Sequence, residues 1–279
     1  MRTLLLSIAM ILGINSPLLP KDRVMSLDYC ADQFLLSIAD KEQIIGVSTE
    51  ARDPHSFHRL NADGIPQFRA DADQILTQNP SLVIRSWAGD KRLLTLLDKL
   101  KIPVISIEHF EDPKDMQSNV MIVANALGQQ ERGKNMIADA ELRLERLRSL
   151  NKFNVSALYL TPGAYTTGSG TFANKVMLLS GIDNIFSLKG YNGWFPIPME
   201  LLVINPPKLI VTSFYDSKSS AQNHWGIARH SYIRDMINDT SSIDVPGSMM
   251  ACSGLFIVDA AEHLRKQMDE LIRKKEMLQ

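Results

Sequence analysis

An internal repeat restricts the possible folds of this chain more than any other feature of its sequence. Residues 71–87 read DADQILTQNPSLVIRSW, and residues 199–214 read MELLVINPPKLIVTSF. When Pro80 is aligned with Pro207, Asp73 corresponds to Glu200, an offset of 127 residues. In each copy an acidic residue opens a short helix, a proline marks the turn, and an apolar run predicts a buried strand. Because the offset is nearly half of the 279 residues, we expect two lobes of similar size.

Strand-like apolar runs alternate with helical patterns in both halves of the chain. In the first half we expect strands at 23–27, 43–48, 80–86 and 104–108, with helices between them. The same alternation returns at residue 155 and ends in a helix that begins near residue 254. Such alternation is typical of parallel sheets whose faces are covered by helices. We therefore predict an α/β fold with two sheets.

The segment between the two halves, residues 112–150, contains no strand-like run. Met116, Val120, Val123 and Leu127 recur at helical spacing, and a second helical pattern follows residue 133. The intervening residues LGQQERG, with Gly128, can bend or interrupt the helix. Nearly forty helical residues span tens of ångströms, so we expect a stiff connection between lobes at 21–111 and 151–279.

The N-terminal residues 1–20 have the layout of a secretory signal: one arginine, an apolar run, then glycine, serine and prolines. An apolar strand or core helix of a cytosolic domain is the alternative. No cysteine follows the apolar run, so we do not expect a lipoprotein. We predict export to the periplasm. A net charge of −1 gives no basic face for nucleic acid, and we exclude that partner.

The chain has only two cysteines, Cys30 and Cys252. In an exported protein they can form one disulfide, but two separate thiols fit the sequence equally well. His55 and His58 have the spacing of a helical metal site, yet nearby residues do not complete a ligand set. We predict neither a protein-bound metal nor a resident cofactor.

The chain resembles the class III periplasmic binding proteins of ABC importers for metal chelates, which include cobalamin-, heme- and ferric-siderophore-binding proteins. The resemblance runs from about residue 23 to the C-terminus. It rests on RVMSLDYCADQFLLSIA with IIGVS, DQILTQNPSLVI, DMQSNVMIVANALGQQERG, TTGSGTFANKVMLLSGIDNIF and ELLVINPPKLIV. It implies two Rossmann-like lobes with parallel sheets, joined by a single long helix, and a ligand cleft between them.

The resemblance also implies an acidic residue on each lobe that docks into arginine-bearing pockets of a dimeric inner-membrane permease. Glu200 falls on one of these positions. Asp73 falls on the other, where the family more often has glutamate. The simpler interpretation is that both carboxylates only stabilise helix N-termini. Symmetric contacts to a two-fold partner are the alternative.

Ligand-binding side chains are expected in the loops that follow strand ends, where an open α/β sheet binds its ligands. A bulky, partly apolar chelate needs aromatic faces and a few polar groups. The predicted contacts are Asp28, Tyr29, Arg85, Trp87, Tyr165, Trp194, Phe195, Tyr215 and Met249. Of these, Trp87, Tyr165 and the loop around Met249 match cleft positions of relatives, although the cobalamin binder has an aromatic residue in place of Met249. Ordinary packing remains the alternative for each aromatic side chain.

Motifs of catalysis are missing from the sequence: it has no nucleophile elbow, phosphate loop or HExxH motif. We therefore expect a binding protein and not an enzyme. The predicted function is capture of an iron-siderophore, cobalamin or heme by a monomer that delivers it to the permease. A ligand sensor or scaffold that signals to a membrane partner is the alternative.

Overall fold

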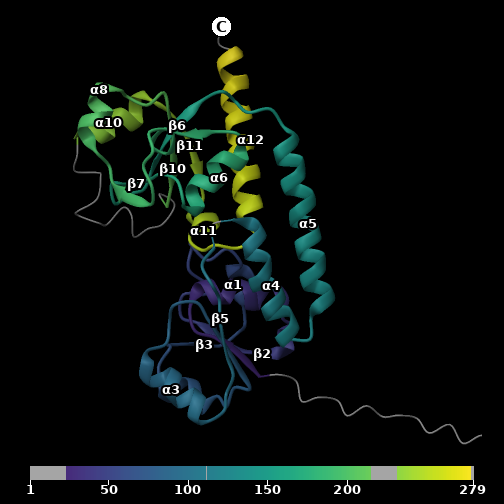
Figure 1. Ribbon diagram of the computed structural model, residues 1–279. Coiled ribbons are helices and arrows are strands. Elements are labelled where there is room, and N and C mark those ends of the chain that lie inside the picture. Colours follow the sequence, from purple (N-terminus) through teal and green to yellow (C-terminus); the bar gives the residue numbers. More distant parts are fainter. Residues whose placement is uncertain (1–22, 111, 215–230, 278–279) are drawn as a thin grey trace, which may run out of the picture.

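The computed structural model describes residues 23–110, 112–214 and 231–277, and it shows two α/β lobes, one above the other in Figure 1. In the N-terminal lobe, five parallel strands lie in the order β3-β2-β1-β4-β5. The strands are β1 (Val24–Ser26), β2 (Ile44–Ser48), β3 (Gln67–Phe68), β4 (Leu82–Arg85) and β5 (Val104–Ser106). The helices are α1 (Tyr29–Ile38), α2 (Ala72–Thr77) and α3 (Lys91–Lys99), with short 3₁₀ turns at Lys41–Gln43 and Arg59–Ala62.

The C-terminal lobe has a parallel sheet of its own, in the order β11-β10-β6-β8. Its strands are β6 (Ser156–Leu160), β8 (Asp183–Asn184), β10 (Leu209–Ser213) and β11 (Ser241–Val245), and β7 (Tyr165–Thr167) pairs with β9 (Trp194–Pro196) in an antiparallel ribbon. The helices are α6 (Phe172–Ser180), α7 (Ile185–Leu188), α8 (Met199–Ile204), α10 (Ser231–Asp239), α11 (Gly247–Met250) and α12 (Ile257–Glu276). The predicted α/β fold is confirmed.

The internal repeat corresponds to the same supersecondary unit in each lobe. Helix α2 precedes β4, and α8 precedes β10, with both strands inside their sheets. Ile75 on α2 and Leu202 on α8 are 1% and 2% exposed, respectively, and they occupy equivalent positions of the repeat. In each lobe, the repeat therefore encodes a helix with a buried face next to a buried strand inside the sheet.

The connecting region consists of two helices, α4 (Pro113–Ala126) and α5 (Gln130–Ser149). The interruption expected near Gly128 is confirmed, because this residue has φ of 69°, where glycine ends a helix at no steric cost. The two helices pack side by side, so the nearly forty residues do not form one strut (Figure 1). Both helices contact both lobes: Met116 of α4 packs in the core of the C-terminal lobe and Val120 in that of the N-terminal lobe, and α5, about 30 Å long, runs beside α4.

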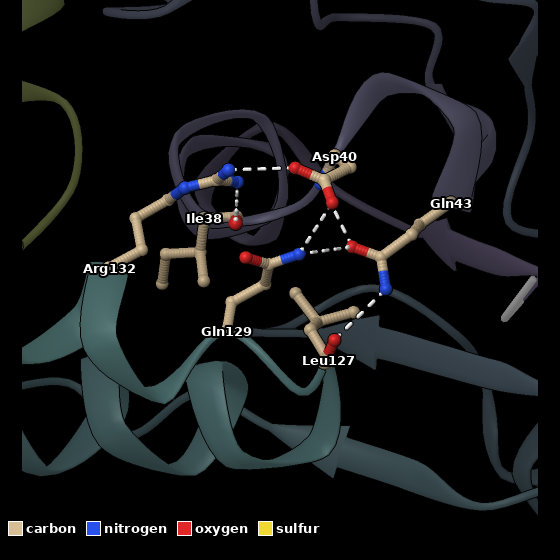
Figure 2. A network of polar contacts seen from close by, with 6 residues as sticks. All are labelled: Ile38, Asp40, Gln43, Leu127, Gln129 and Arg132. Atoms are coloured by element: carbon tan, nitrogen blue, oxygen red, sulfur yellow. Dashed lines mark hydrogen bonds and ion pairs between the residues drawn. The ribbon is translucent and has the colours of Figure 1, made fainter. Parts of the chain in front are cut away.

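The turn between α4 and α5 is fixed to the end of α1 by a polar network (Figure 2). Arg132 donates to the carbonyl of Ile38 and forms an ion pair of 2.7 Å with Asp40. Gln129 donates to the same carboxylate and to Gln43. The hydrogen bond from Arg132 lowers the pKa of Asp40 below its usual value. The start of α5 is therefore held against the N-terminal lobe.

A cluster of ion pairs and one separate ion pair hold the helical connection against the C-terminal lobe. On α5, Arg143 contacts Asp259 at 2.8 Å and Glu262 at 2.6 Å, both on α12. At the N-terminus of α4, Asp112 caps the helix and contacts Lys175 of α6 at 2.6 Å. Because the connection is attached to both lobes, it limits how far they can swing apart.

The N-terminal signal sequence expected in residues 1–20 lies outside the described residues. Across the described ranges, no helix combines the length and the apolar character needed to cross a bilayer.

Candidate ligand-binding cleft

Each sheet has a point where its strand order reverses, and ligands in open α/β sheets bind beside such points. In the N-terminal lobe the reversal lies between the adjacent strands β1 and β4. In the C-terminal lobe it lies between β6 and β10. The loops that follow these four strands are therefore the first place to look for a ligand site.

Two hollows lie at the strand ends and share four lining residues, so together they form the cleft. The hollow on the N-terminal lobe has a volume of about 560 Å³ and is lined by Tyr29, Arg85, Trp87 and Glu108, among others. The hollow on the C-terminal lobe has a volume of about 330 Å³ and is lined by Thr171, Phe172, Trp194, Phe214 and Met250, among others. Both hollows share His109, Ala251, Cys252 and Ser253, which form the floor between the lobes.

The N-terminal wall of the cleft carries the rings of Tyr29 and Trp87. The ring of Tyr29 packs edge-on against His55 at 4.8 Å and against Trp87 at 5.9 Å, measured between ring centroids. Trp87 is 55% exposed and lines the hollow. Burial, followed by the negative charges of Glu50 and Asp28, raises the pKa of the Tyr29 hydroxyl, which therefore remains a hydrogen-bond donor.

Asp28 and Arg85, both expected to contact the ligand, form hydrogen bonds to the backbone of their own lobe. Asp28 is completely buried, and its carboxylate accepts hydrogen bonds from backbone amides of α1 and of the loop after β4. Arg85 does line the hollow, but its guanidinium donates to the carbonyls of Trp87 and Ala88. Both side chains are therefore engaged in holding the loop that carries Trp87.

In the C-terminal wall, the side chains of Trp194 and its neighbour Phe195 lie on opposite faces of β9. Successive residues of a strand point to opposite faces. Trp194 is 49% exposed and lines the hollow, whereas Phe195 packs against Phe186 and Tyr191. Phe195 is partly buried against the core of the lobe and does not line either hollow.

The remaining predicted contacts have different positions. The pairing of β7 with β9 places Tyr165 on the same ribbon face as Trp194, and Tyr165 is 48% exposed, although it does not line either hollow. Met249 is partly buried against the core of the C-terminal lobe, and its neighbour Met250 lines the hollow instead. Tyr215 lies outside the described residues.

The floor contains residues that the sequence analysis missed. His109 Nδ1 lies 3.1 Å from Ser253 Oγ, and the imidazole is exposed to both hollows. His109 follows strand β5, so the strand-end rule that selected the aromatic residues would also have selected it. Beside it, Cys30 and Cys252 form a disulfide with a Cα–Cα distance of 5.5 Å. The bond settles the pairing that the sequence left open.

No group of three or more potential metal ligands gathers anywhere in the described part of the chain. The two histidines considered in the sequence point to different neighbours: His55 contacts Tyr29, and His58 contacts Phe57. Neither is positioned to form a paired metal site with the other.

A third cavity of about 150 Å³ lies among α1, α4, α5 and the start of α12. Its walls include Phe34, Val120 and Phe256, and it is far smaller than the cleft. It does not lie at a strand-order reversal, so it lacks the feature that marks the ligand site of this fold.

The repeat carboxylates Asp73 and Glu200 are both exposed on the first turns of α2 and α8. Neither forms a hydrogen bond or ion pair through its side chain with any described residue. The cap of α2 is Asp71, which accepts from the Gln74 amide at 3.0 Å, so Asp73 does not cap this helix.

The periplasmic binding protein family matches this chain over residues 24–233, which is most of its length. The chain belongs to the periplasmic binding protein family. Members of this family are binding proteins, in agreement with two lobes that enclose a cleft. No curated protein sequence gives a significant match.

Solved structures of periplasmic binding proteins share this fold at low sequence identity. The heme-binding protein HutB of Vibrio cholerae has a TM-score of 0.72 and 18% identity, covering 89% of this chain and 99% of that one. A heme-binding protein of Pseudomonas aeruginosa has a TM-score of 0.67 and 17% identity, covering 88% and 91%. The vitamin B12-binding protein BtuF of Vibrio cholerae has a TM-score of 0.63 and 19% identity, covering 89% and 96%.

Proposed function

We propose that this protein is the solute-binding component of an ABC importer and that it carries a metal chelate across the periplasm. The observation that carries the proposal is the single cleft formed by two hollows, with an indole on each wall, Trp87 and Trp194. Flat or bulky chelates with conjugated surfaces pack well between aromatic faces. The combined hollows suit a ligand larger than an amino acid or a simple sugar.

Heme is the chelate that the cleft residues favour. His109 on the floor supplies an imidazole, which is an established axial ligand of heme iron. Its Nδ1 faces Ser253, so Nε2 is the nitrogen left to approach a metal. Trp87, Tyr29 and Trp194 supply ring contacts for the macrocycle. Two of the solved relatives described above bind heme and one binds vitamin B12.

Delivery to the membrane rests on the exposed carboxylates Asp73 and Glu200. They occupy equivalent positions in the two lobes, and α2 already has its cap in Asp71. A dimeric permease in the inner membrane has two equivalent surfaces, which two equivalent acidic groups can engage. We propose that the free protein is a monomer and that the signal sequence in residues 1–20 directs its export.

The test is a titration of the folded mature protein with heme, cobalamin and a panel of ferric siderophores. Tryptophan quenching reports occupancy of the cleft, and the absorption spectrum reports ligation of iron. We expect saturable heme binding at micromolar or tighter affinity and a changed heme spectrum in His109→Ala. Binding of another panel member, with no heme spectrum, would reassign the cargo. No binding across the panel would favour a sensor or scaffold.

A further inference from the structure

We infer that Asp28 is a positioning residue that presents Trp87 to the ligand by fixing the backbone of residues 86–88. This inference rests on the proposed function, because it gives Trp87 a role in ligand binding. It adds a residue that does not itself contact the ligand. The carboxylate instead acts through the loop that follows β4 and forms one wall of the cleft.

One oxygen of Asp28 binds three consecutive backbone amides. Oδ2 accepts from Ser86 at 2.7 Å, from Trp87 at 3.1 Å and from Ala88 at 3.1 Å. Oδ1 accepts from the Ala31 amide at 2.9 Å and so caps α1. Asp28 and the loop are 58 to 60 residues apart in sequence, so this contact joins separate segments of the lobe.

The opposite side of the same loop is held by Arg85. Its guanidinium donates to the carbonyls of Trp87, at 2.9 Å, and of Ala88. The amides and carbonyls of the loop therefore both have partners, although the Trp87 indole is 55% exposed. A loop that carries an exposed aromatic residue is normally mobile. Here the backbone is fixed before any ligand arrives, which lowers the entropy lost on binding.

Helix capping alone does not explain why position 28 is an aspartate. Capping uses one oxygen and a single amide, and serine would perform that task as well. The second oxygen and its three loop contacts serve only to position residues 86–88. Asp28→Ser therefore separates the two tasks, since its short hydroxyl retains the cap and cannot reach the loop.

The first experiment needs no ligand. In a protein with Trp194→Phe and Trp225→Phe, Trp87 is the only tryptophan, and its anisotropy decay reports the motion of its indole. We expect Asp28→Ser and Asp28→Asn to increase the amplitude of fast indole motion at least about twofold. The matched control is Asp32→Asn, because Asp32 is equally buried on the same helix but bonds Ser26 and Ser48. Unchanged motion in both Asp28 variants would overturn the inference.

The second experiment is a double-mutant cycle with heme as the probe. Asp28→Ser is expected to weaken heme binding about tenfold when Trp87 is present and less than about twofold when Trp87 is alanine. Equal losses in both backgrounds would mean that Asp28 only supports the fold, and would overturn the inference. If Trp87→Ala binds heme as tightly as the wild type, Trp87 does not contact the ligand and the inference is overturned. If the wild-type protein binds no heme, the proposed cargo fails while the anisotropy result still stands.

Discussion

Cys30 and Cys252 join the two lobes by a disulfide, although 222 residues separate them in the sequence. Cys30 lies in the first turn of α1 in the N-terminal lobe, and Cys252 lies between α11 and α12 in the C-terminal lobe. Both residues line the larger hollow of the cleft. The bond therefore fixes the distance between the lobes beside the cleft, as a connection additional to α4 and α5.

Removing this disulfide should destabilise the protein and widen the cleft. A cross-link that closes a loop of this length restricts the unfolded chain strongly, so Cys30→Ser with Cys252→Ser should cost about 3–5 kcal/mol of unfolding free energy. Urea denaturation measures this loss, with reduced wild type as the matched comparison. Small-angle scattering of the native double variant should show a larger radius of gyration. An unchanged radius of gyration would mean that α4 and α5 alone keep the lobes at their native separation.

Asp73→Ala with Glu200→Ala should abolish most transport and leave chelate affinity within about twofold of the wild type. Both carboxylates are exposed, and neither lines either hollow of the cleft. Uptake by the reconstituted importer and equilibrium binding separate the two effects. Asp71→Ala is the control, because it removes a neighbouring carboxylate that caps α2 and should cost only about 1 kcal/mol of stability. A loss of affinity in the double variant would show that these residues have been assigned the wrong role.

The adjacent residues Trp194 and Phe195 should respond to alanine in opposite ways. Trp194 faces the cleft, so Trp194→Ala should weaken chelate binding about tenfold with little change in stability. Phe195 packs against Phe186 and Tyr191, so Phe195→Ala should cost about 2–3 kcal/mol and leave the affinity of the folded protein unchanged. Calorimetry and thermal unfolding of both variants test this contrast. If both substitutions changed the chelate affinity to a similar extent, the side chains of β9 would not face the cleft as described.

Asp32 should make the protein less stable as pH rises from about 4 to 7. Burial raises the pKa of this carboxyl from 3.8 to about 6, against the hydrogen bonds from Ser26 and Ser48 that lower it. Between these values the folded state binds more protons than the unfolded state, so this contribution is present below pH 3.8 and is lost as pH rises through about 6. The loss is on the order of 3 kcal/mol. Denaturation at several pH values should show a flatter profile in Asp32→Asn. If the unfolding free energy of the wild type and of Asp32→Asn depended on pH in the same way, the raised pKa of Asp32 would be contradicted.

Arg143→Ala should loosen the attachment of α5 to the C-terminal lobe. Hydrogen bonds to Glu262 and Asp259 raise the pKa of the Arg143 guanidinium, and their loss should cost about 2 kcal/mol of unfolding free energy. Lys134→Ala on the same helix is the control, since Lys134 pairs with the exposed Glu131 and its loss should cost about 0.5 kcal/mol or less. Equal denaturation midpoints for the two variants would contradict this role.

Several cleft contacts were predictable from strand ends, because the carboxyl ends of parallel strands are where side chains of different loops meet. Tyr29, Trp87 and Trp194, which this rule selected, line the two hollows. The rule also assigned Asp28 and Phe195 to the cleft, although one is buried beneath a loop and the other lies on the far face of β9. Burial and strand face depend on register, which the sequence pattern alone does not fix for strands of three residues.

The sequence by itself determined the two-lobe α/β plan, the repeat of helix and strand, and the interruption at Gly128. These features arise from local periodicity and backbone preference, which act over a few residues. Only the tertiary structure decided that Cys30 meets Cys252, that His109 meets Ser253, and that one oxygen of Asp28 holds three amides. These contacts join residues far apart in the chain. The geometry of the Asp28 contacts is set by packing within the N-terminal lobe, and that of the other two by how the lobes meet.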